Sequence, residues 1–185
     1  METLQAFCTA HSLRKRIAAS RDRLFRVALA WSSDPMCADD LVQETLETAL
    51  DKVHQLRDPD RLYAWMYSIM HNGWRHCMTQ RRRRPECDLD EYPVISDSNP
   101  EQASERESVV VQVRRAIARL PEGQREVLTL VDLEGFTYRE VADILKIPIG
   151  TVMSRLNRAR GFLQSVLRGL HEEGARHGMA LRRVK

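Results

Sequence analysis

The sequence predicts an all-α protein with two small helical domains joined by a flexible linker, the C-terminal one a helix-turn-helix. Three observations lead to this fold class. Apolar residues recur three and four positions apart along most of the 185 residues. A stretch without that spacing divides the chain, and helix-start and helix-stop residues punctuate both halves. We expect domains at 1–86 and 105–170, a linker at 87–104 and a tail at 171–185.

Basic residues are bunched along the chain, although the net charge is only +3. The bunches lie at Arg14–Arg16, Arg81–Arg84, Arg155–Arg160 and Arg182–Lys185. Such clustering is typical of proteins that contact a polyanion. No apolar run approaches the ~18–20 residues of a membrane span, and the N-terminal stretch lacks the order of a signal peptide. We therefore expect a cytoplasmic protein without membrane insertion.

The cysteines predict reduced thiols rather than a disulfide framework. They are far apart in sequence and form no C-x-x-C pair: Cys8, Cys37, Cys77 and Cys87. A metal site using His71, His76 and Cys77 is conceivable, but a fourth ligand at the usual spacing is missing. We expect no metal and no cofactor.

The first expected helix runs from Ile17 to Trp31, after some 15 weakly patterned residues that form a short helix or a loose arm. Ser32 and Ser33 interrupt it. Asp34 is a good N-cap for the next helix, and Pro35 suits its first position because that position needs no N–H donor.

The second helix, about Pro35–Val53, is two-faced. Its apolar side has the spacing of one helix face: Ala38, Leu41, Val42, Thr45, Leu46, Ala49 and Leu50. The opposite side is acidic for three turns. The helix dipole explains acids in the first turn but not a longer row. The row could hold a divalent cation, as in an enzyme, but we favour a basic partner surface.

A loop at Gln55–Asp60 precedes a long helix at about Arg61–Arg83. Its buried stripe is expected to contain Leu62, Trp65, Met66, Ile69 and Cys77. Three further rings stand near the arginine run: Tyr63, Tyr67 and Trp74. Aromatic rings interleaved with arginines suit single-stranded nucleic acid, since bases stack on rings while arginines follow phosphates. Burial in the core is the alternative for Trp65 and Tyr67, and we expect it for Trp65.

The second half begins after the acidic linker with helices near 104–120 and 121–133, and Gly135 is placed to end the latter. The linker, if extended, could reach ~60 Å, so the halves could occupy separate stretches of DNA. After Leu170 the weakly patterned tail is expected to fray.

A helix-turn-helix is predicted next. Thr137 and Glu140 form a T-x-x-E capping box, and Pro148 separates two short helices. The second helix buries Val152, Leu156, Ala159 and Leu163 and exposes Met153, Ser154, Asn157 and Arg158. A polar, basic exposed side is typical of a recognition helix. The alternative is an ordinary helical hairpin with a solvated charged face.

Three stretches together resemble the ECF (extracytoplasmic function) sigma factors, the compact two-domain bacterial transcription initiation factors. LFRVALAWSSDPMCADDLVQETLETAL at Leu24–Leu50 is similar to region 2.1–2.2, and RLYAWMYSIMHNGWRHCMTQRRRR at Arg61–Arg84 to region 2.3–2.4. IARLPEGQREVLTLVDLEGFTYREVADILKIPIGTVMSRLNRAR at Ile117–Arg160 is similar to region 4. The resemblance implies a factor, not an enzyme, that binds core RNA polymerase and promoter DNA and is controlled by an anti-sigma factor.

The resemblance also implies site residues. The polymerase, through its β′ clamp helices and β subunit, would meet Asp39, Asp40, Gln43 and Glu44. The melted minus-10 element would meet Asp58, Arg61, Leu62, Tyr63, Asn72, Arg75, Arg81 and Arg82, with a flipped base captured near the loop and Asn72. In the minus-35 duplex, the base edges of the major groove would meet Met153, Ser154, Asn157 and Arg158. The phosphates would meet Tyr138, Arg139, Arg155 and Arg160.

Some residues depart from the family pattern and leave the promoter sequence open. Met153 stands where many relatives have a basic residue, Leu62 where an aromatic residue is frequent, and His71 and Trp74 where smaller residues are common. The runner-up function is a stand-alone helix-turn-helix regulator. A third hypothesis is a metal-dependent nuclease or phosphohydrolase built on the acidic row and His71.

Overall fold

The computed structural model describes residues 2–83 and 109–181, and these two ranges are helical with no strand. The first range contains α1 (Glu2–Ala19), α2 (Arg21–Ser32), α3 (Pro35–Asp51), the single turns η1 (Val53–Gln55) and η2 (Pro59–Arg61), and α4 (Leu62–Arg83). The second contains α5 (Val109–Ala118), α6 (Glu122–Leu128), η3 (Thr129–Leu133), α7 (Tyr138–Leu145) and α8 (Ile149–Leu181). The predicted linker at 87–104 lies outside the described residues.

The N-terminus of α3 forms as the sequence predicts. The Asp34 carboxylate accepts a hydrogen bond from the Met36 N–H at 3.0 Å, and Pro35 occupies the first turn. The cap satisfies a backbone donor that the helix itself leaves unpaired. The chain can turn sharply before this cap because Ser33 adopts a left-handed conformation with φ 56°.

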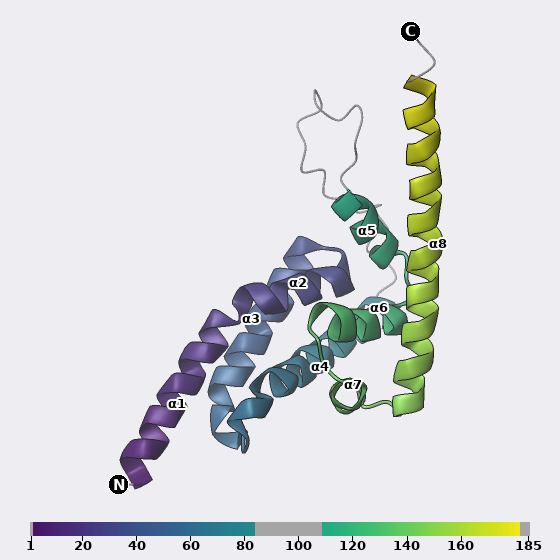
Figure 1. The fold of residues 1–185 in the computed structure, drawn as a ribbon. Helices are drawn as coiled ribbons and strands as arrows, with labels where there is room; N and C mark the ends of the chain where they lie inside the picture. Colours follow the sequence, from purple (N-terminus) through teal and green to yellow (C-terminus); the bar gives the residue numbers. More distant parts are fainter. Residues whose placement is uncertain (1, 84–108, 182–185) are drawn as a thin grey trace.

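Helices α3 and α4 pack closely against each other and run in opposite directions (Figure 1). Near one end of the pair, Arg81 lies 3.5 Å from the carboxylate of Asp34. Further along, a Cβ placed on Gly73 would be 3.1 Å from the Leu41 methyl group Cδ1. The absence of a side chain at Gly73 therefore permits this close approach.

The helix-turn-helix also forms as predicted. Thr137 and Glu140 make both hydrogen bonds of the capping box at the start of α7. Lys146 then takes a left-handed conformation with φ 55°, and Pro148 precedes the first residue of α8. Gly135, which was predicted to end the preceding helix, has φ 77°, a value that favours glycine.

Three helix predictions need correction. The N-terminal residues form a full helix, α1. The predicted helix over 121–133 is α-helical only to Leu128 and continues as one turn of π-helix, η3. The tail does not fray after Leu170, because α8 continues to Leu181. The tail's glycines each cost only about 1 kcal/mol relative to alanine, and no proline stops the helix.

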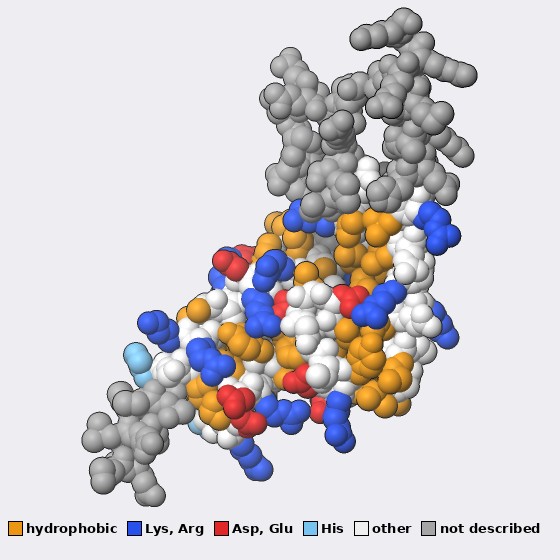
Figure 2. Space-filling model, viewed as in Figure 1, with side chains coloured by type: hydrophobic (Ala, Val, Ile, Leu, Met, Phe, Trp, Pro, Cys, Tyr) orange, Lys and Arg blue, Asp and Glu red, His pale blue; other side chains and the backbone are white. Residues whose placement is uncertain are grey.

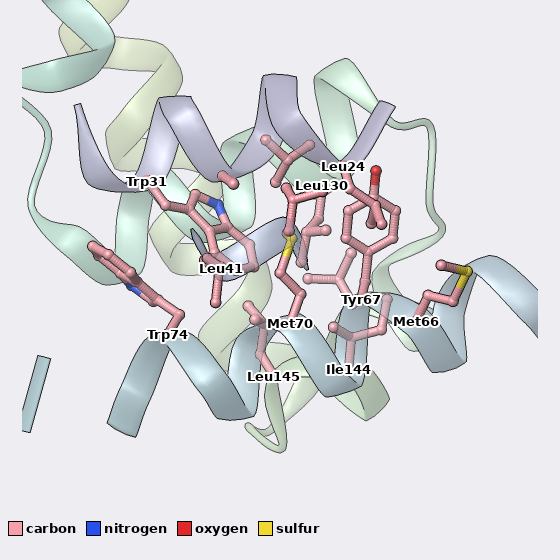
Figure 3. Packing of buried hydrophobic residues seen from close by; sticks show 14 of the residues in the cluster. Leu24, Trp31, Leu41, Met66, Tyr67, Met70, Trp74, Leu130, Ile144 and Leu145 are labelled. Carbon is pink, nitrogen blue, oxygen red and sulfur yellow. The ribbon is translucent and has the colours of Figure 1, made fainter. Parts of the chain in front are cut away.

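The two halves are helical domains as predicted, and in this structure they share one continuous apolar core. Leu24, Trp31 and Met70 of the first half belong to the same buried cluster as Leu130 and Ile144 of the second (Figure 3). The rings of Tyr67 and Phe136 meet edge to face across the junction, with centroids 5.4 Å apart. The helix-turn-helix is thus docked on α4.

Candidate polymerase and nucleic-acid interfaces

The acidic side of α3 is exposed, as predicted. The helix buries Ala38, Leu41, Val42, Thr45 and Ala49, and the acidic residues between them face solvent. All four predicted polymerase contacts are exposed: Asp39, Asp40, Gln43 and Glu44. Asp39 pairs with exposed Arg21, and the Gln43 amide donates to Glu47 at 3.0 Å. Exposed pairs of this kind are weak, so this face remains available to a basic partner.

The recognition side of α8 is exposed as well. Val152, Leu156 and Ala159 are buried against the other helices of the second half. The predicted base-reading residues lie on the solvent side: Met153, Ser154, Asn157 and Arg158. A polar helix face that stays clear of its own core has the form required to enter a major groove.

The residues that flank this face differ in exposure and in whether they already contact another residue of the protein. Arg139 is exposed, and Tyr138 is half-buried. The Arg160 guanidinium donates to Asp132 at 3.1 Å, and this hydrogen bond raises the pKa of Arg160. Arg155 is half-buried and lies directly over Gly123 of α6, where an added Cβ would meet its guanidinium at 2.6 Å. Two of the predicted phosphate contacts therefore already have partners within the protein.

The loop before α4 is engaged by the second half. Asp58 caps η2 by accepting from the Asp60 N–H at 3.0 Å. Arg61 pairs with Asp143 of α7 at 3.3 Å. The Tyr63 ring lies under the guanidinium of Arg23, 4.3 Å from the ring centroid, within the range of a cation–π contact.

Leu62 requires a correction. Its side chain is fully buried in the core, so it cannot contact a DNA base in this structure. The physical reason is its position at the first turn of α4, where an apolar residue packs inward and its neighbours on either side face outward.

Asn72 lies in a different place from the loop. It is exposed and lines an open pocket of about 320 Å³ between α3 and α4. The other lining residues are Glu44, Thr45, Thr48, Lys52, Trp65, Ile69, Gly73 and His76. None of the predicted loop contacts lines it. Arg75 and Arg81 are exposed, and the side chain of Arg82 lies outside the described residues.

Two of the aromatic predictions on α4 need correction. Trp65, expected in the core, is half-buried: it packs against the core and also lines the pocket. Tyr67 and Trp74, expected to stack on nucleic acid, are 0% and 2% exposed. The second half of the chain covers Tyr67. The spacing of apolar residues within α4 cannot predict this burial, because the covering residues belong to other helices.

Polar groups from the turn of π-helix and its neighbours join the two halves. Arg23 of α2 donates to the carboxylate of Glu134, whose side chain is only 2% exposed. The Trp31 indole N–H donates to the Thr129 hydroxyl at 2.8 Å. Arg125 donates to the Trp31 carbonyl at 2.9 Å and thereby satisfies a carbonyl at the end of α2. We call Arg23, Trp31, Thr129, Arg125 and Glu134 the interdomain contacts.

A buried titratable pair completes this junction. A ring nitrogen of His71 on α4 lies 3.7 Å from the Glu126 carboxylate on α6. Burial lowers the pKa of His71 to about 4, and burial together with Glu122 raises the pKa of Glu126 to about 7. Between these values both groups are mainly neutral. The short distance therefore joins two uncharged groups rather than an ion pair.

The described residues contain no group of three or more His, Cys, Asp and Glu side chains that could hold a metal ion. His71 faces Glu126 and not the acidic row, which weakens the nuclease hypothesis. In the described part of the chain, none of the helices has the length and apolar character needed to cross a bilayer.

Comparisons with known proteins agree on one family. Residues 17–84 match the family model for Sigma-70 region 2, and residues 111–163 match that for Sigma-70, region 4. The chain is 38% identical to the ECF RNA polymerase sigma factor EcfG of Rhodopseudomonas palustris, over 84% of this chain and 85% of that protein. It is 31% identical to the RNA polymerase sigma-H factor of Pseudomonas aeruginosa, over 76% and 78% of the two chains.

Solved structures are similar too. The sigma factor RpoE of Bartonella quintana, in complex with the anti-sigma factor NepR, matches with a TM-score of 0.70 and 30% identity, over 85% of this chain and 97% of that one. CnrH in complex with the cytosolic domain of CnrY shares the fold, with a TM-score of 0.61 and 24% identity.

Proposed function

The chain belongs to the ECF family of RNA polymerase sigma factors, and we propose that its two halves divide the family's task between polymerase and promoter. It directs RNA polymerase to specific promoters as a transcription initiation factor. The observation that carries the proposed division is the pair of separate exposed faces, an acidic one on α3 and a polar, basic one on α8. We propose no catalytic role for either face.

The acidic face of α3 is proposed to bind the polymerase. Exposed carboxylates in a row on one rigid helix match a basic helical surface such as the β′ clamp helices. Asp40 and Glu44 lie one turn apart on this row, and both are exposed. A contact with the β subunit is expected from the same half.

The exposed face of α8 is proposed to read the minus-35 duplex. Arg158 would pair with a guanine edge and Asn157 with a neighbouring base, while Arg139 would contact a phosphate. Met153 is the least polar member of this face and is 50% exposed. We expect it to contact a thymine methyl or a sugar rather than to donate a hydrogen bond.

The minus-10 element is proposed to use both the pocket and the loop before α4. The Trp65 ring and the Asn72 amide could stack on and hydrogen-bond to an unpaired base in the pocket between α3 and α4. Arg61 pairs with Asp143 of the second half, and Tyr63 lies under Arg23, a residue of the first half that is held by Glu134 of the second. Departure of the second half would release Arg61 from Asp143 and Arg23 from Glu134. We therefore propose that the halves separate when the promoter melts.

Control by an anti-sigma factor is part of the proposed function. The similar sigma factor RpoE was solved in complex with the anti-sigma factor NepR. A factor that stays closed presents fewer groups to the minus-10 element, so a partner that favours closure would inhibit it. The protein would act in the cytoplasm, where it meets polymerase and DNA, and without a cofactor.

In vitro transcription tests this function. The purified chain is added to sigma-free bacterial core polymerase and promoter fragments, and transcript starts are mapped. We expect specific starts that require the chain, and their loss in Asp40→Arg with Glu44→Arg. Transcription that is absent despite tight binding of duplex DNA by the chain alone would contradict the proposal and favour a stand-alone regulator.

A further inference from the structure

Two cysteines with no part in the proposed function lie where α3 packs on α4. Cys37 is on α3 and Cys77 on α4, and both are half-buried. They are 40 positions apart in sequence (77 − 37), so no cysteine motif marks them as partners. The packing of the two helices brings them together.

The register of the helix pair places them opposite each other. One contact joins Asp34 to Arg81 at 3.5 Å, and another brings Leu41 against Gly73. In an antiparallel pair, a step forward on one helix is matched by a step back on the other. A residue about midway between Asp34 and Leu41 therefore faces one about midway between Gly73 and Arg81. Cys37 and Cys77 occupy these two positions.

The electrostatics of the thiols agree with this register. Burial, and next the neighbouring Cys77, raise the pKa of Cys37 to about 11. Cys77 could not have this effect from a distance. The helices also approach closely, since Gly73 lacks a side chain one turn away. Close approach is the main geometric requirement for a disulfide, whose Cα atoms lie ~4.4–6.8 Å apart.

We propose that Cys37 and Cys77 form a reversible intramolecular disulfide when the protein meets a hydroperoxide. The Cys77 thiolate attacks the outer peroxide oxygen, the O–O bond breaks, and an alcohol or water leaves, which gives a sulfenic acid. Cys37 then loses its proton, its sulfur attacks the Cys77 sulfur, and the S–O bond breaks with release of water. The two thiols together lose two electrons, and the peroxide gains them.

Cys77 is assigned the first attack because Cys37 is held mainly in its neutral form at physiological pH. The Cys37 thiol serves as the resolving group. A buried resolving thiol makes the second step slow, so the sulfenic acid should be detectable before the disulfide.

The bond would act on the pocket between α3 and α4. Glu44 and Thr48 line the pocket from one helix, and Asn72 and His76 line it from the other. Cys77 directly follows His76 in the chain. A covalent link at this point fixes the spacing of the two pocket walls. An effect on promoter melting follows if the pocket accepts a base, so this part rests on the proposed function.

Mass spectrometry of the full chain tests the chemistry. The variant C8S/C87S keeps only the two facing thiols. After treatment with hydrogen peroxide and then N-ethylmaleimide, we expect an unlabelled monomer and a peptide that links Cys37 to Cys77, both reversed by dithiothreitol. Dimedone should trap Cys77 first. If N-ethylmaleimide labels both thiols after the peroxide treatment, or if a disulfide forms only between two molecules, the proposal is overturned. The matched control C8S/C37S/C87S cannot form the internal bond.

Transcription with core polymerase tests the consequence. Oxidised C8S/C87S should give several-fold fewer transcripts than the same sample after dithiothreitol, and the C8S/C37S/C87S control should not respond in this way. Equal transcription by the oxidised and reduced forms would overturn the effect on the pocket. Failure of the reduced protein to transcribe at all would instead count against the proposed function, and the peptide result would still decide whether the disulfide forms.

Discussion

The two surfaces proposed to read DNA differ in exposure and in their contacts with the rest of the protein. The recognition face of α8 is open to solvent, and Arg158 on it is exposed. The loop before α4 is occupied: Arg61 pairs with Asp143, and Tyr63 lies under Arg23, which Glu134 holds in turn. Base reading by the exposed side of α8 therefore needs no rearrangement, whereas the residues at the loop before α4 are released from the second half only when the halves separate.

The junction that must open is not simply apolar. Leu130 and Phe136 contribute apolar contact, but a charged pair also joins the halves: the Glu134 side chain is 2% exposed and that of its partner Arg23 is 33% exposed. Removal of Arg23 is the costly change, because it would leave the Glu134 carboxylate buried without a partner. A few polar groups can therefore decide whether the halves stay together. On the face of the molecule shown in Figure 2, basic and acidic side chains lie interspersed among hydrophobic ones rather than in one single charged patch.

The largest predicted effect is at Glu134. Glu134→Ala removes the acceptor of Arg23, which is itself one-third exposed and can be hydrated, so we expect the free energy of closure to fall by about 1.5–3 kcal/mol. Fluorescence energy transfer between dyes at Asp22 and Gln164, in a cysteine-free background, should drop while helicity is retained. Asp132→Ala is the matched control, since it removes the exposed partner of Arg160, and we expect a change below ~1 kcal/mol. Equal transfer in Glu134→Ala and the unchanged protein would refute the role of this pair.

A smaller loss is predicted at Arg158. Arg158→Ala should weaken holoenzyme binding to the minus-35 duplex by about 1–3 kcal/mol and relax the preference at one base pair. Fluorescence anisotropy with substituted duplexes measures both effects. Energy transfer between the halves should not change. Arg168→Ala, on the same helix and also exposed, is the control. A loss that is equal for all sequences would make Arg158 a phosphate contact instead.

The pH dependence of closure should reveal two opposing groups. Separation returns Glu126 and His71 to their ordinary pKa values of 4.5 and 6.5, whereas closure holds them at about 7 and about 4. The contribution of Glu126 to closure is complete below pH 4.5 and is lost as the pH rises to about 7. The contribution of His71 is complete above pH 6.5 and is lost as the pH falls to about 4. Each slope is at most about 1.4 kcal/mol per pH unit.

Single substitutions separate the two slopes. In Glu126→Gln, closure should weaken only as the pH falls, because only His71 still titrates. In His71→Gln, closure should weaken only as the pH rises, because only Glu126 still titrates. Energy transfer between the two halves, recorded from pH 4 to 8, measures each curve. Identical curves for both variants would mean that neither group titrates on separation.

The smallest predicted effect concerns the capping box. Thr137→Ala removes the hydroxyl that accepts from the Glu140 N–H at 3.3 Å, and should lower stability by about 1 kcal/mol. Urea unfolding measures the change. Thr137→Ser keeps the hydroxyl and should restore most of the stability. Binding of the minus-35 duplex through Arg158 should also weaken slightly, because α7 packs against α8 and helps to position it. A loss as large as that of Glu134→Ala would show that the cap also governs closure.

The fold was largely predictable because its signals are local. The Asp34 cap, the Thr137–Glu140 box, the break at Pro148 and the left-handed Gly135 each depend on a few neighbouring residues. The faces of α3 and α8 also follow from spacing within one helix. These are the parts of the candidate sites that the sequence predicts correctly.

The remaining features depend on contacts distant in sequence. Tyr67 is buried because Phe136 covers it, and Arg23 meets Glu134 from 111 positions away. The turn of π-helix that presents Glu134 has no signature in composition. One feature of the sequence could have predicted a contact between the halves. Glu126 directly precedes two apolar residues of the core, and a carboxylate at such a position indicates a polar partner on another element.

The length of α8 has a mechanical consequence. It is one helix of 33 residues, so at 1.5 Å per residue it is a rod of about 50 Å. Asn157 and Arg158 lie near its beginning, and the other end is far from the DNA they would read. From Arg158 to Leu181 the helix extends for about 35 Å, so a rotation of about 10° at the groove moves the far end by about 6 Å. A partner that binds the distal end of α8 would therefore change the angle at which Asn157 and Arg158 meet the base edges.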